Sequence, residues 1–198
     1  MLRAMIAVLL LAGPAAATQE YILPTLFDVT DVASDDVLNI RSEPHAGSPV
    51  IGSLAADAAR IEVVEERDGW ARVNTGEGSS WASMRFLSPR SDTWQEGALP
   101  QGFSCFGTEP FWDLQAEGDS LVLRSPDNPD DARPRQAVLG SGIFRDPMRA
   151  VLGRDLTLVA VPQLCSDGMS DRLFGLRATL VLQDGTPRLL SGCCSIAP

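Results

Sequence analysis

Short apolar runs separated by turn residues recur along most of the chain, and this spacing restricts it to β structure. In the first half, residues 38–41 alternate apolar and polar side chains, while 50–54 and 61–65 are rich in β-branched residues. Both patterns are typical of short strands in a barrel or sandwich. Asp-Gly pairs at 68–69 and 184–185 predict tight hairpin turns, because glycine accepts a positive φ. The predicted fold class is all-β.

The second half, residues 103–198, repeats the pattern as a separate unit. A polar stretch rich in Gly and Pro, residues 90–102, is predicted to be the linker between the two halves. Six runs are expected to be strands: 111–114, 120–124, 136–139, 155–161, 176–182 and 187–192. No stretch has sustained helical periodicity, and residues 144–152 have room for only a turn or two of helix. We therefore predict a second β unit, a barrel or a sandwich of about 95 residues, large enough to bury its own core.

The N-terminus has the features of a secretory signal. Arg3 precedes an apolar run at 6–11, and three alanines at 15–17 come before Thr18. Residues 1–17 are therefore predicted to be a signal peptide cleaved after Ala17. The apolar run is too short to span a bilayer, which needs roughly 20 apolar residues. We expect a periplasmic or secreted protein without stable membrane insertion.

The charge balance argues against a nucleic-acid partner. The chain has 26 acidic and 16 basic residues, a formal net charge of −10, whereas nucleic-acid phosphates favour basic patches. Its single histidine, His45, lies in a loop that contains Pro and Gly, so a solvated position is expected. The chain thus has little capacity for acid and base catalysis near neutral pH. No cofactor or metal is predicted.

All four cysteines lie in the second half. Because the chain is predicted to be exported, they are expected to meet an oxidising compartment. They are Cys105, Cys165, Cys193 and Cys194. An even number in such a chain indicates disulfides. A bond between the adjacent Cys193 and Cys194 would be strained, so Cys105 and Cys165 are each predicted to bond one of them, in either order. Neighbours on a strand point to opposite faces, so one bridge is expected inside and one outside. A zinc site and a redox pair are the alternatives.

Four blocks of the first half occur in a characteristic order. They read Leu-Asn-Ile-Arg-Ser-x-Pro (38–44), Val-Ile-Gly-Ser-Leu (50–54), Gly-Trp-Ala-Arg-Val (69–73) and Gly-x-x-Trp-Ala-x-x-x-Phe-Leu (78–87). This stretch resembles the bacterial SH3 (SH3b) family. The resemblance implies a small exported β-barrel at residues 26–89, which in some relatives binds cell-wall peptides and in others serves as a spacer or docking unit.

Five residues of this SH3-like stretch are candidate ligand contacts: Asn39, Arg41, Trp70, Trp81 and Arg85. Arginines on an acidic protein are available to bind an anionic ligand. The alternative for both tryptophans is packing in the barrel core. Two positions depart from the family pattern: Ala82, where valine is common, and Phe86, where tyrosine is common. The second change removes a hydroxyl group that could contact a ligand.

Three stretches of the second half resemble a family of uncharacterised bacterial envelope proteins. They read Cys-x-Gly-x-Glu-Pro-Phe-Trp (105–112), Cys-x-Asp-Gly-Met-Ser-Asp (165–171) and Gly-Cys-Cys (192–194). Phe174 stands where that family commonly has tyrosine. The resemblance implies a domain without an established activity. The candidate functional residues here are Glu109, Trp112, Asp167, Asp171 and Arg172.

The sequence favours a non-enzymatic exported binding protein, whose SH3-like half binds a peptide, a peptidoglycan component or an envelope protein, and whose second half is an accessory domain. One alternative is an acid-base hydrolase in which Glu109, Asp167 and Asp171 converge. However, carboxylates in turns usually bond their own backbone, and Glu109 could be held by Arg172 or by backbone donors. Another alternative is an inhibitor of a secreted enzyme.

Overall fold

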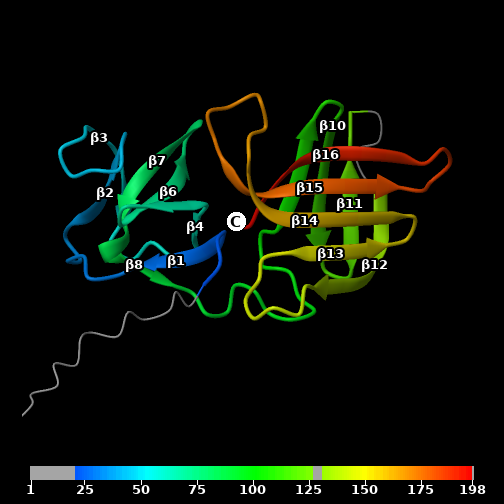
Figure 1. Ribbon diagram of the computed structural model, residues 1–198, viewed down its shortest axis with the longest axis horizontal. Coiled ribbons are helices and arrows are strands. Elements are labelled where there is room, and N and C mark those ends of the chain that lie inside the picture. Colours follow the sequence, from blue (N-terminus) through cyan, green and yellow to red (C-terminus); the bar gives the residue numbers. More distant parts are fainter. Residues whose placement is uncertain (1–20, 127–130, 198) are drawn as a thin grey trace, which may run out of the picture.

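The computed structural model describes residues 21–126 and 131–197, and it is all-β, as predicted. The predicted signal peptide lies outside these residues. Figure 1 shows two β bodies side by side, joined near the middle of the long axis. Among the described residues, no helix is long and apolar enough to cross a membrane.

The N-terminal half consists of two antiparallel sheets packed against each other. The three-stranded sheet has the order β4-β1-β8 and the five-stranded sheet the order β3-β2-β7-β6-β5. The strands are β1 (Thr25–Val29), β2 (Val37–Arg41), β3 (Val50–Ala55), β4 (Ile61–Val63), β5 (Glu65–Arg67), β6 (Trp70–Thr75), β7 (Gly78–Ser83) and β8 (Leu87–Pro89). Phe27, Ile40 and Val63 are fully buried between the sheets. Asp68 and Gly69 both have positive φ in the β5–β6 turn, which the Asp-Gly pair predicted.

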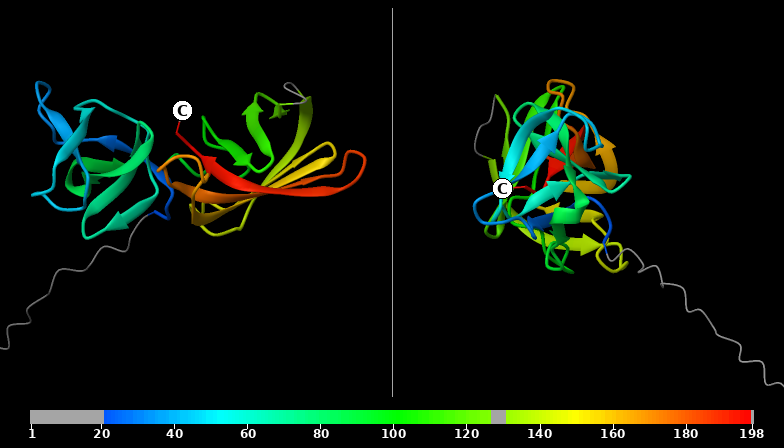
Figure 2. Two further views of the ribbon diagram at one scale, coloured as in Figure 1. Left: turned by 90° about the horizontal axis from the view of Figure 1, so that it is seen from above. Right: turned by 90° about the vertical axis from the view of Figure 1, so that its left-hand side faces the viewer.

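The C-terminal half is a closed barrel of eight antiparallel strands, of which the sequence allowed either a barrel or a sandwich. Each strand pairs with the next along the chain, and the last pairs with the first. The strands are β9 (Ser104–Thr108), β10 (Phe111–Glu117), β11 (Ser120–Arg124), β12 (Asp131–Gly140), β13 (Arg149–Gly153), β14 (Leu156–Cys165), β15 (Phe174–Leu182) and β16 (Arg188–Ser195). Figure 2 shows the barrel from above, with β16 curving along its length.

The turn or two of helix for which the sequence left room at 144–152 does not form. Residues 149–153 form β13, which pairs with β12 and with β14, and the described residues 141–148 form the loop before it. Apolar residues at 144, 148 and 151 have helical spacing, but Phe144 is 79% exposed while Val151 is fully buried. Alternate burial along β13 is the pattern of a strand.

Two disulfides link the last strand of the barrel, β16, to β9 and to the end of β14. Cys105 bonds Cys194 and Cys165 bonds Cys193, which fits the predicted pattern and settles the order. Cys105 and Cys194 belong to the interior core, whereas Cys165 and Cys193 pack outside with Phe106 and Phe174. The predicted inside and outside bridges are therefore present. No cysteine is free.

The barrel end that faces the N-terminal half is filled partly by residues from outside the barrel. Leu26 of β1 and Trp94, from the segment that leads to β9, belong to the same apolar cluster as the barrel interior. The Trp94 indole N–H donates to the Pro24 carbonyl oxygen at 2.7 Å. Pro24 also packs on Gly175 of β15, where an added Cβ would lie 2.5 Å from the proline ring. The two halves therefore share one core.

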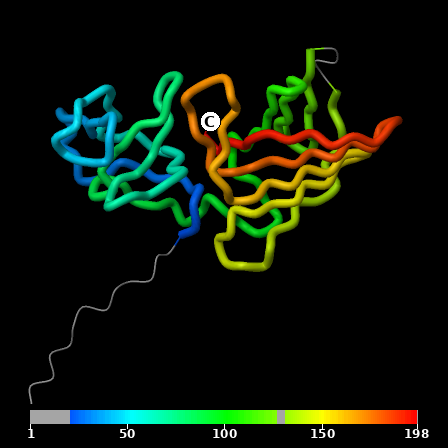
Figure 3. The backbone as a smooth tube through the Cα atoms, turned by 45° about the horizontal axis from the view of Figure 1, so that its top comes forward, coloured from blue at the N-terminus to red at the C-terminus, as the bar shows by residue number. Residues whose placement is uncertain are grey.

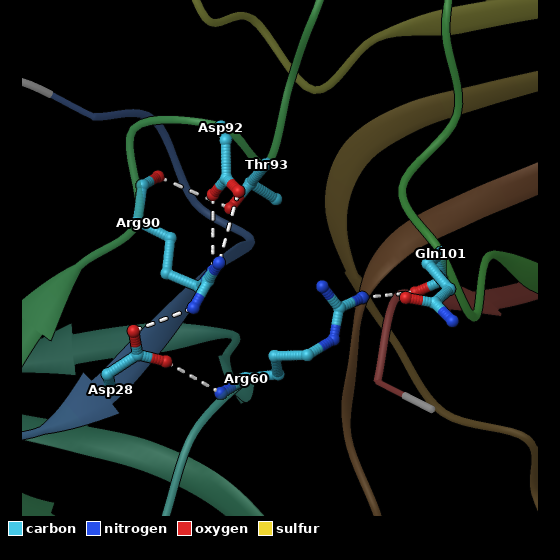
Figure 4. Close-up of polar contacts among 6 residues, drawn as sticks. All are labelled: Asp28, Arg60, Arg90, Asp92, Thr93 and Gln101. Atoms are coloured by element: carbon cyan, nitrogen blue, oxygen red, sulfur yellow. Dashed lines mark hydrogen bonds and ion pairs between the residues drawn. The ribbon is translucent and has the colours of Figure 1, made fainter.

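Polar contacts reinforce this junction, as Figure 4 shows. The Asp28 carboxylate accepts the Arg60 backbone N–H at 2.9 Å and the Arg90 guanidinium at 2.7 Å. Arg90 also donates to Asp92, and the Arg60 side chain donates to the Gln101 carbonyl oxygen at 2.6 Å. Residues 90–102 were expected to be a linker. The segment is hydrogen-bonded to the N-terminal half at both ends, through Arg90 at its start and the Gln101 carbonyl oxygen near its end.

A buried carboxylate, Glu62 of β4, holds the chain's C-terminal segment against the N-terminal half. Its Oε2 accepts the Ser195 hydroxyl at 2.6 Å and the backbone N–H groups of Ile196 and Ala197 at 3.2 and 3.3 Å. Its Oε1 is buried and has no hydrogen-bond partner among the described residues. Burial raises the pKa of Glu62 more than these three bonds lower it.

The shared core predicts that a substitution in β1 destabilises the barrel. Leu26→Ala leaves a cavity at the barrel end, and we expect a loss of about 2 to 5 kcal/mol in chemical denaturation. Amide exchange in β14 and β15 should accelerate as well. The control is Ile22→Ala, because Ile22 is 40% exposed; its effect should stay within about 0.5 kcal/mol. If Leu26→Ala loosened only residues of the N-terminal half, the shared core would be disproved.

Glu62 predicts a specific dependence of stability on pH. Because its pKa is raised on folding, the folded protein keeps this proton to higher pH than the unfolded chain does. The stability that it contributes is therefore full at low pH and falls as pH rises through the folded-state pKa. In urea denaturation between about pH 4 and pH 8, the wild type should lose stability relative to Glu62→Gln as pH increases. Parallel pH curves for the two proteins would contradict this.

Candidate functional site

A pocket of about 390 Å³ opens on the N-terminal half, and four of the five predicted contacts line it. Asn39 and Arg41 come from β2, Trp70 begins β6, and Arg85 lies in the 3₁₀ turn Met84–Phe86. We call this cavity the N-terminal pocket. It is formed where β2, the start of β6 and the loop before β2 meet.

The lining of the N-terminal pocket combines charges of both signs with apolar surface. Asp31 and Asp36 supply carboxylates, and Arg41 and Arg85 supply guanidinium groups. Trp70, which is partly exposed, adds an aromatic surface. Sequence reasoning missed the two aspartates. The sequence feature that could have indicated them is the acidic stretch at 31–36, which directly precedes the first SH3-like block at 38–44. No role was assigned to this stretch.

Arg41 is positioned by the loop that follows it. Its Nη1 donates to the Ser48 carbonyl oxygen at 2.7 Å. The Ser48 side chain is buried and lies 2.9 Å from the Glu43 carbonyl oxygen, which it bonds. Loop 42–49 therefore has internal hydrogen bonds, and Ala46 at its tip lines the pocket. The pocket wall on this side is organised before any ligand binds.

Trp81 does not line the N-terminal pocket. It is 4% exposed, and the Arg72 and Arg67 guanidinium groups lie 4.6 and 5.1 Å from the centre of its ring. These are cation-π contacts that cover the ring. This placement fits the alternative role of the tryptophan, packing within the fold, and gives no support to Trp81 as a ligand contact.

In the second half, the three sequence stretches that carry the envelope-family resemblance meet at one groove. The groove has a volume of about 640 Å³ and is bordered by Gly107–Glu109, Ser166–Met169 and Ser191–Cys193. We call it the barrel groove. Glu109 and Asp167 both line it, but Asp171 does not. The three carboxylates of the hydrolase alternative are therefore not assembled in one site.

The Asp167 carboxylate is bonded to its own loop. It accepts the backbone N–H groups of Met169 and Ser170, each at 2.9 Å, and the Ser170 hydroxyl at 2.9 Å. Burial alone would raise the pKa of Asp167, but these bonds outweigh it and the pKa is lowered. Asp167 is thus held as a carboxylate, which is the wrong state for a general acid near neutral pH.

Asp171 and Arg172 lie at the junction of the two halves instead. The Asp171 backbone N–H donates to the Glu77 carbonyl oxygen at 3.0 Å, and the Arg172 side chain donates to the Gly76 carbonyl oxygen at 2.6 Å. Asn74 adds a bond to the Leu173 carbonyl oxygen at 2.9 Å. Figure 3 shows this contact, in which the β14–β15 loop stands beside the β6–β7 hairpin. The suggestion that Arg172 holds Glu109 finds no support in these contacts.

Trp112 is 4% exposed and belongs to the barrel core. Its indole N–H donates to the Ser191 carbonyl oxygen at 3.3 Å, so it connects β10 to β16 past Gly107 of the intervening strand β9. Phe111, its neighbour, points the other way and is 52% exposed. Trp112 therefore occupies a structural position, while Phe111 borders the barrel groove. The sequence made Trp112 a candidate functional residue, and its buried position gives that role no support.

Comparison with known proteins now bears on the N-terminal half. Residues 36–88 match the family model of the bacterial SH3 domain. This match supports the resemblance drawn from the four sequence blocks and covers most of the lining of the N-terminal pocket. No curated protein and no solved structure matches the chain. For the second half, the envelope-family resemblance stays a prediction.

The pocket geometry predicts the effect of removing Arg41. Arg41→Ala deletes the bond to the Ser48 carbonyl oxygen, so loop 42–49 should open more often. Hydrogen exchange followed by mass spectrometry should show faster exchange in this loop, with a stability loss of about 0.5 to 1.5 kcal/mol. Arg67→Ala is the matched control, because Arg67 lies outside the pocket. Unchanged exchange in loop 42–49 would show that Arg41 does not position it.

Proposed function

We propose that this protein is an exported binding protein whose SH3 domain binds a peptide or a peptidoglycan component in the N-terminal pocket. Binding is the activity that the match of residues 36–88 to the bacterial SH3 domain favours, because relatives of this family often bind the cell wall. The observation that carries the proposal is the gathering of Asn39, Arg41, Trp70 and Arg85 around one cavity.

The chemistry of the pocket suits a short peptide that carries both charges. Arg41 and Arg85 can each bind a carboxylate, in the bidentate geometry that guanidinium favours. Asp31 and Asp36 can bind an amino group, and Trp70 offers a flat apolar surface to the aliphatic parts of the ligand. The peptides of the bacterial cell wall carry carboxylates and amino groups close together, so they fit this set of partners.

Export to the periplasm or beyond is part of the proposal. The N-terminal signal pattern supports it, and so do the two disulfides, because such bonds persist in oxidising compartments. A cell-wall ligand would be present in the same compartment. The barrel half then serves as an envelope-associated accessory domain that is fixed to the SH3 domain.

The test is sedimentation of the purified chain from residue 18 to 198 with isolated peptidoglycan. We expect the wild type to sediment and Trp70→Ala and Arg85→Ala to bind at least about tenfold more weakly, a loss of about 1.4 kcal/mol. Arg67→Ala should bind like the wild type. Circular dichroism checks that each variant is folded. If folded variants of the pocket sediment as the wild type does, the pocket is not the binding site.

The same incubation separates binding from hydrolysis. A binding protein leaves no soluble wall fragments, whereas the hydrolase alternative releases products that disappear in Glu109→Gln. Absence of any wall or peptide binding by the wild type would reject the proposed function. Release of soluble wall fragments that is lost in Glu109→Gln would show that the protein is a hydrolase instead.

A further inference from the structure

We infer that the mouth of the C-terminal barrel is a binding site for a small, uncharged and largely apolar molecule. A cavity of about 370 Å³ lies there, and its described lining comes entirely from the barrel. We call this cavity the barrel mouth. Only Phe111 borders both it and the barrel groove. The inference rests on the inward direction of the lining side chains and on the pairing of their charges.

The register of β11 and β12 shows that the cavity lies inside the barrel. Leu121 and Leu123 of β11 belong to the barrel core. They pair directly with Arg133 and Asp131 of β12. Because directly paired residues share one face of a sheet, Arg133 and Asp131 point inward as well.

The same reasoning places two residues of β16 on the inner face. Leu180 and Leu182 of β15 belong to the barrel core, and they pair with Leu190 and Arg188. Leu189, which lies between these two residues of β16, is 66% exposed. The cavity is therefore lined from within by strands on both sides of the barrel.

The inner wall of the barrel mouth is apolar. Leu123, Leu182 and Leu190 form it, and the first two are held almost wholly buried by the barrel core. Exposed Pro110 and Phe111 add apolar surface where the cavity meets solvent. A concave apolar wall with a few polar groups is the usual form of a small-ligand site, and the mouths of β-barrels are a common place for one.

The two ends of the barrel differ. The end that faces the N-terminal half is filled by Leu26 and Trp94. The barrel mouth lies beside the β15–β16 hairpin, which Figures 1 and 2 show at the end of the molecule farthest from the N-terminal half. No described residue of the N-terminal half lines this cavity. The N-terminal half thus fills one end of the barrel, and the cavity is at the other.

A buried arginine pairs the charges of the barrel mouth. The Arg133 guanidinium donates from Nε to the Asp131 carboxylate at 3.0 Å, and it also donates to the Asp184 carboxylate. Its Nη1 donates to the Asp155 carbonyl oxygen at 3.1 Å. The Arg188 Nη2 lies 3.7 Å from the Asp184 carboxylate. Two guanidinium groups and two carboxylates therefore balance one another in the cavity.

These ion pairs decide the class of ligand. The hydrogen bond from Arg133 lowers the pKa of Asp184, so this carboxylate stays ionised and paired. A charged ligand would have to displace an existing partner or lose its hydration without gaining one, and either change costs free energy. An uncharged molecule loses little hydration and gains from covering the apolar wall.

The size and stiffness of the barrel mouth limit the ligand further. Its volume of about 370 Å³ is near the lower end of the range of about 300 to 1,000 Å³ for small-molecule sites. A compact molecule of a few rings, or a short aliphatic chain, fits this space. Arg133 connects β12 to the β13–β14 and β15–β16 turns, so the cavity is formed before a ligand binds.

Two fluorescent probes with the same aromatic framework test both parts of the inference. N-phenyl-1-naphthylamine is uncharged, and 8-anilinonaphthalene-1-sulfonate adds one sulfonate group to that framework. Each is titrated with the chain from residue 18 to 198, and binding is followed by the rise in probe fluorescence. The variant is Leu190→Arg, which puts a charged side chain into the barrel mouth. The matched control is Leu189→Arg, because Leu189 faces solvent.

We expect the uncharged probe to bind the wild type and Leu189→Arg alike, with a Kd of about 1 to 10 μM. Leu190→Arg should bind this probe at least about tenfold more weakly. The sulfonate probe should bind the wild type at least about tenfold more weakly than the uncharged probe does, because it finds no free partner for its charge. Circular dichroism checks that each variant is folded.

If Leu190→Arg does not fold, nuclear magnetic resonance on the wild type locates the uncharged probe. With labelled leucine methyl groups, we expect nuclear Overhauser contacts from the probe to Leu123, Leu182 and Leu190. Leu189, on the outer face, should show no such contact.

Several results would overturn the inference. One is the absence of binding of the uncharged probe up to about 100 μM. Another is equal binding by folded Leu190→Arg and Leu189→Arg, or probe contacts that exclude the three inward leucines. Loss of binding in Trp70→Ala would place the probe in the N-terminal pocket instead. Equal or tighter binding of the sulfonate probe would show that the ligand is not an uncharged molecule.

Discussion

The insertion of Leu26 and Trp94 into the end of the barrel is the contact on which the rest of this structure depends. A closed barrel of eight strands has an interior just wide enough for side chains to fill, and both ends need a cover. Here one end is covered by a residue of β1 and a residue of the segment before β9. The N-terminal half therefore completes the core of the barrel, and the Pro24 ring packs directly on Gly175 of β15.

Much of the fold follows from local signals in the sequence. Alternating apolar residues located most strands, and the Asp-Gly pair at 68–69 located a hairpin turn. The loop and strand at 144–153 were harder, because the spacing of Phe144, Met148 and Val151 imitates a helix face. What decides their state is pairing with β12 and β14, and such pairing is invisible in a single local window.

The candidate site was predictable to a similar degree. The four blocks of the SH3 pattern contained the residues of β2 and β6 that line the N-terminal pocket. The burial of Trp81 under two arginines depends on side-chain packing from β5 and β6, so the tryptophan alone could not reveal it. Glu62 and Ser195 form a hydrogen bond although they lie 133 positions apart in the sequence. The residues next to either one in the sequence carry no pattern that predicts this contact.

A core shared between the two halves also has a geometric consequence. Flexible tandem modules sample many relative positions, and their linked affinity depends on the length of the linker. In this molecule, the relative position of the two halves is fixed by hydrogen bonds. They are made by the Trp94 indole, the Glu62 carboxylate and the arginines at the junction. The N-terminal half and the barrel are therefore held at one spacing and one angle, so any partner that contacts both halves must fit this fixed geometry.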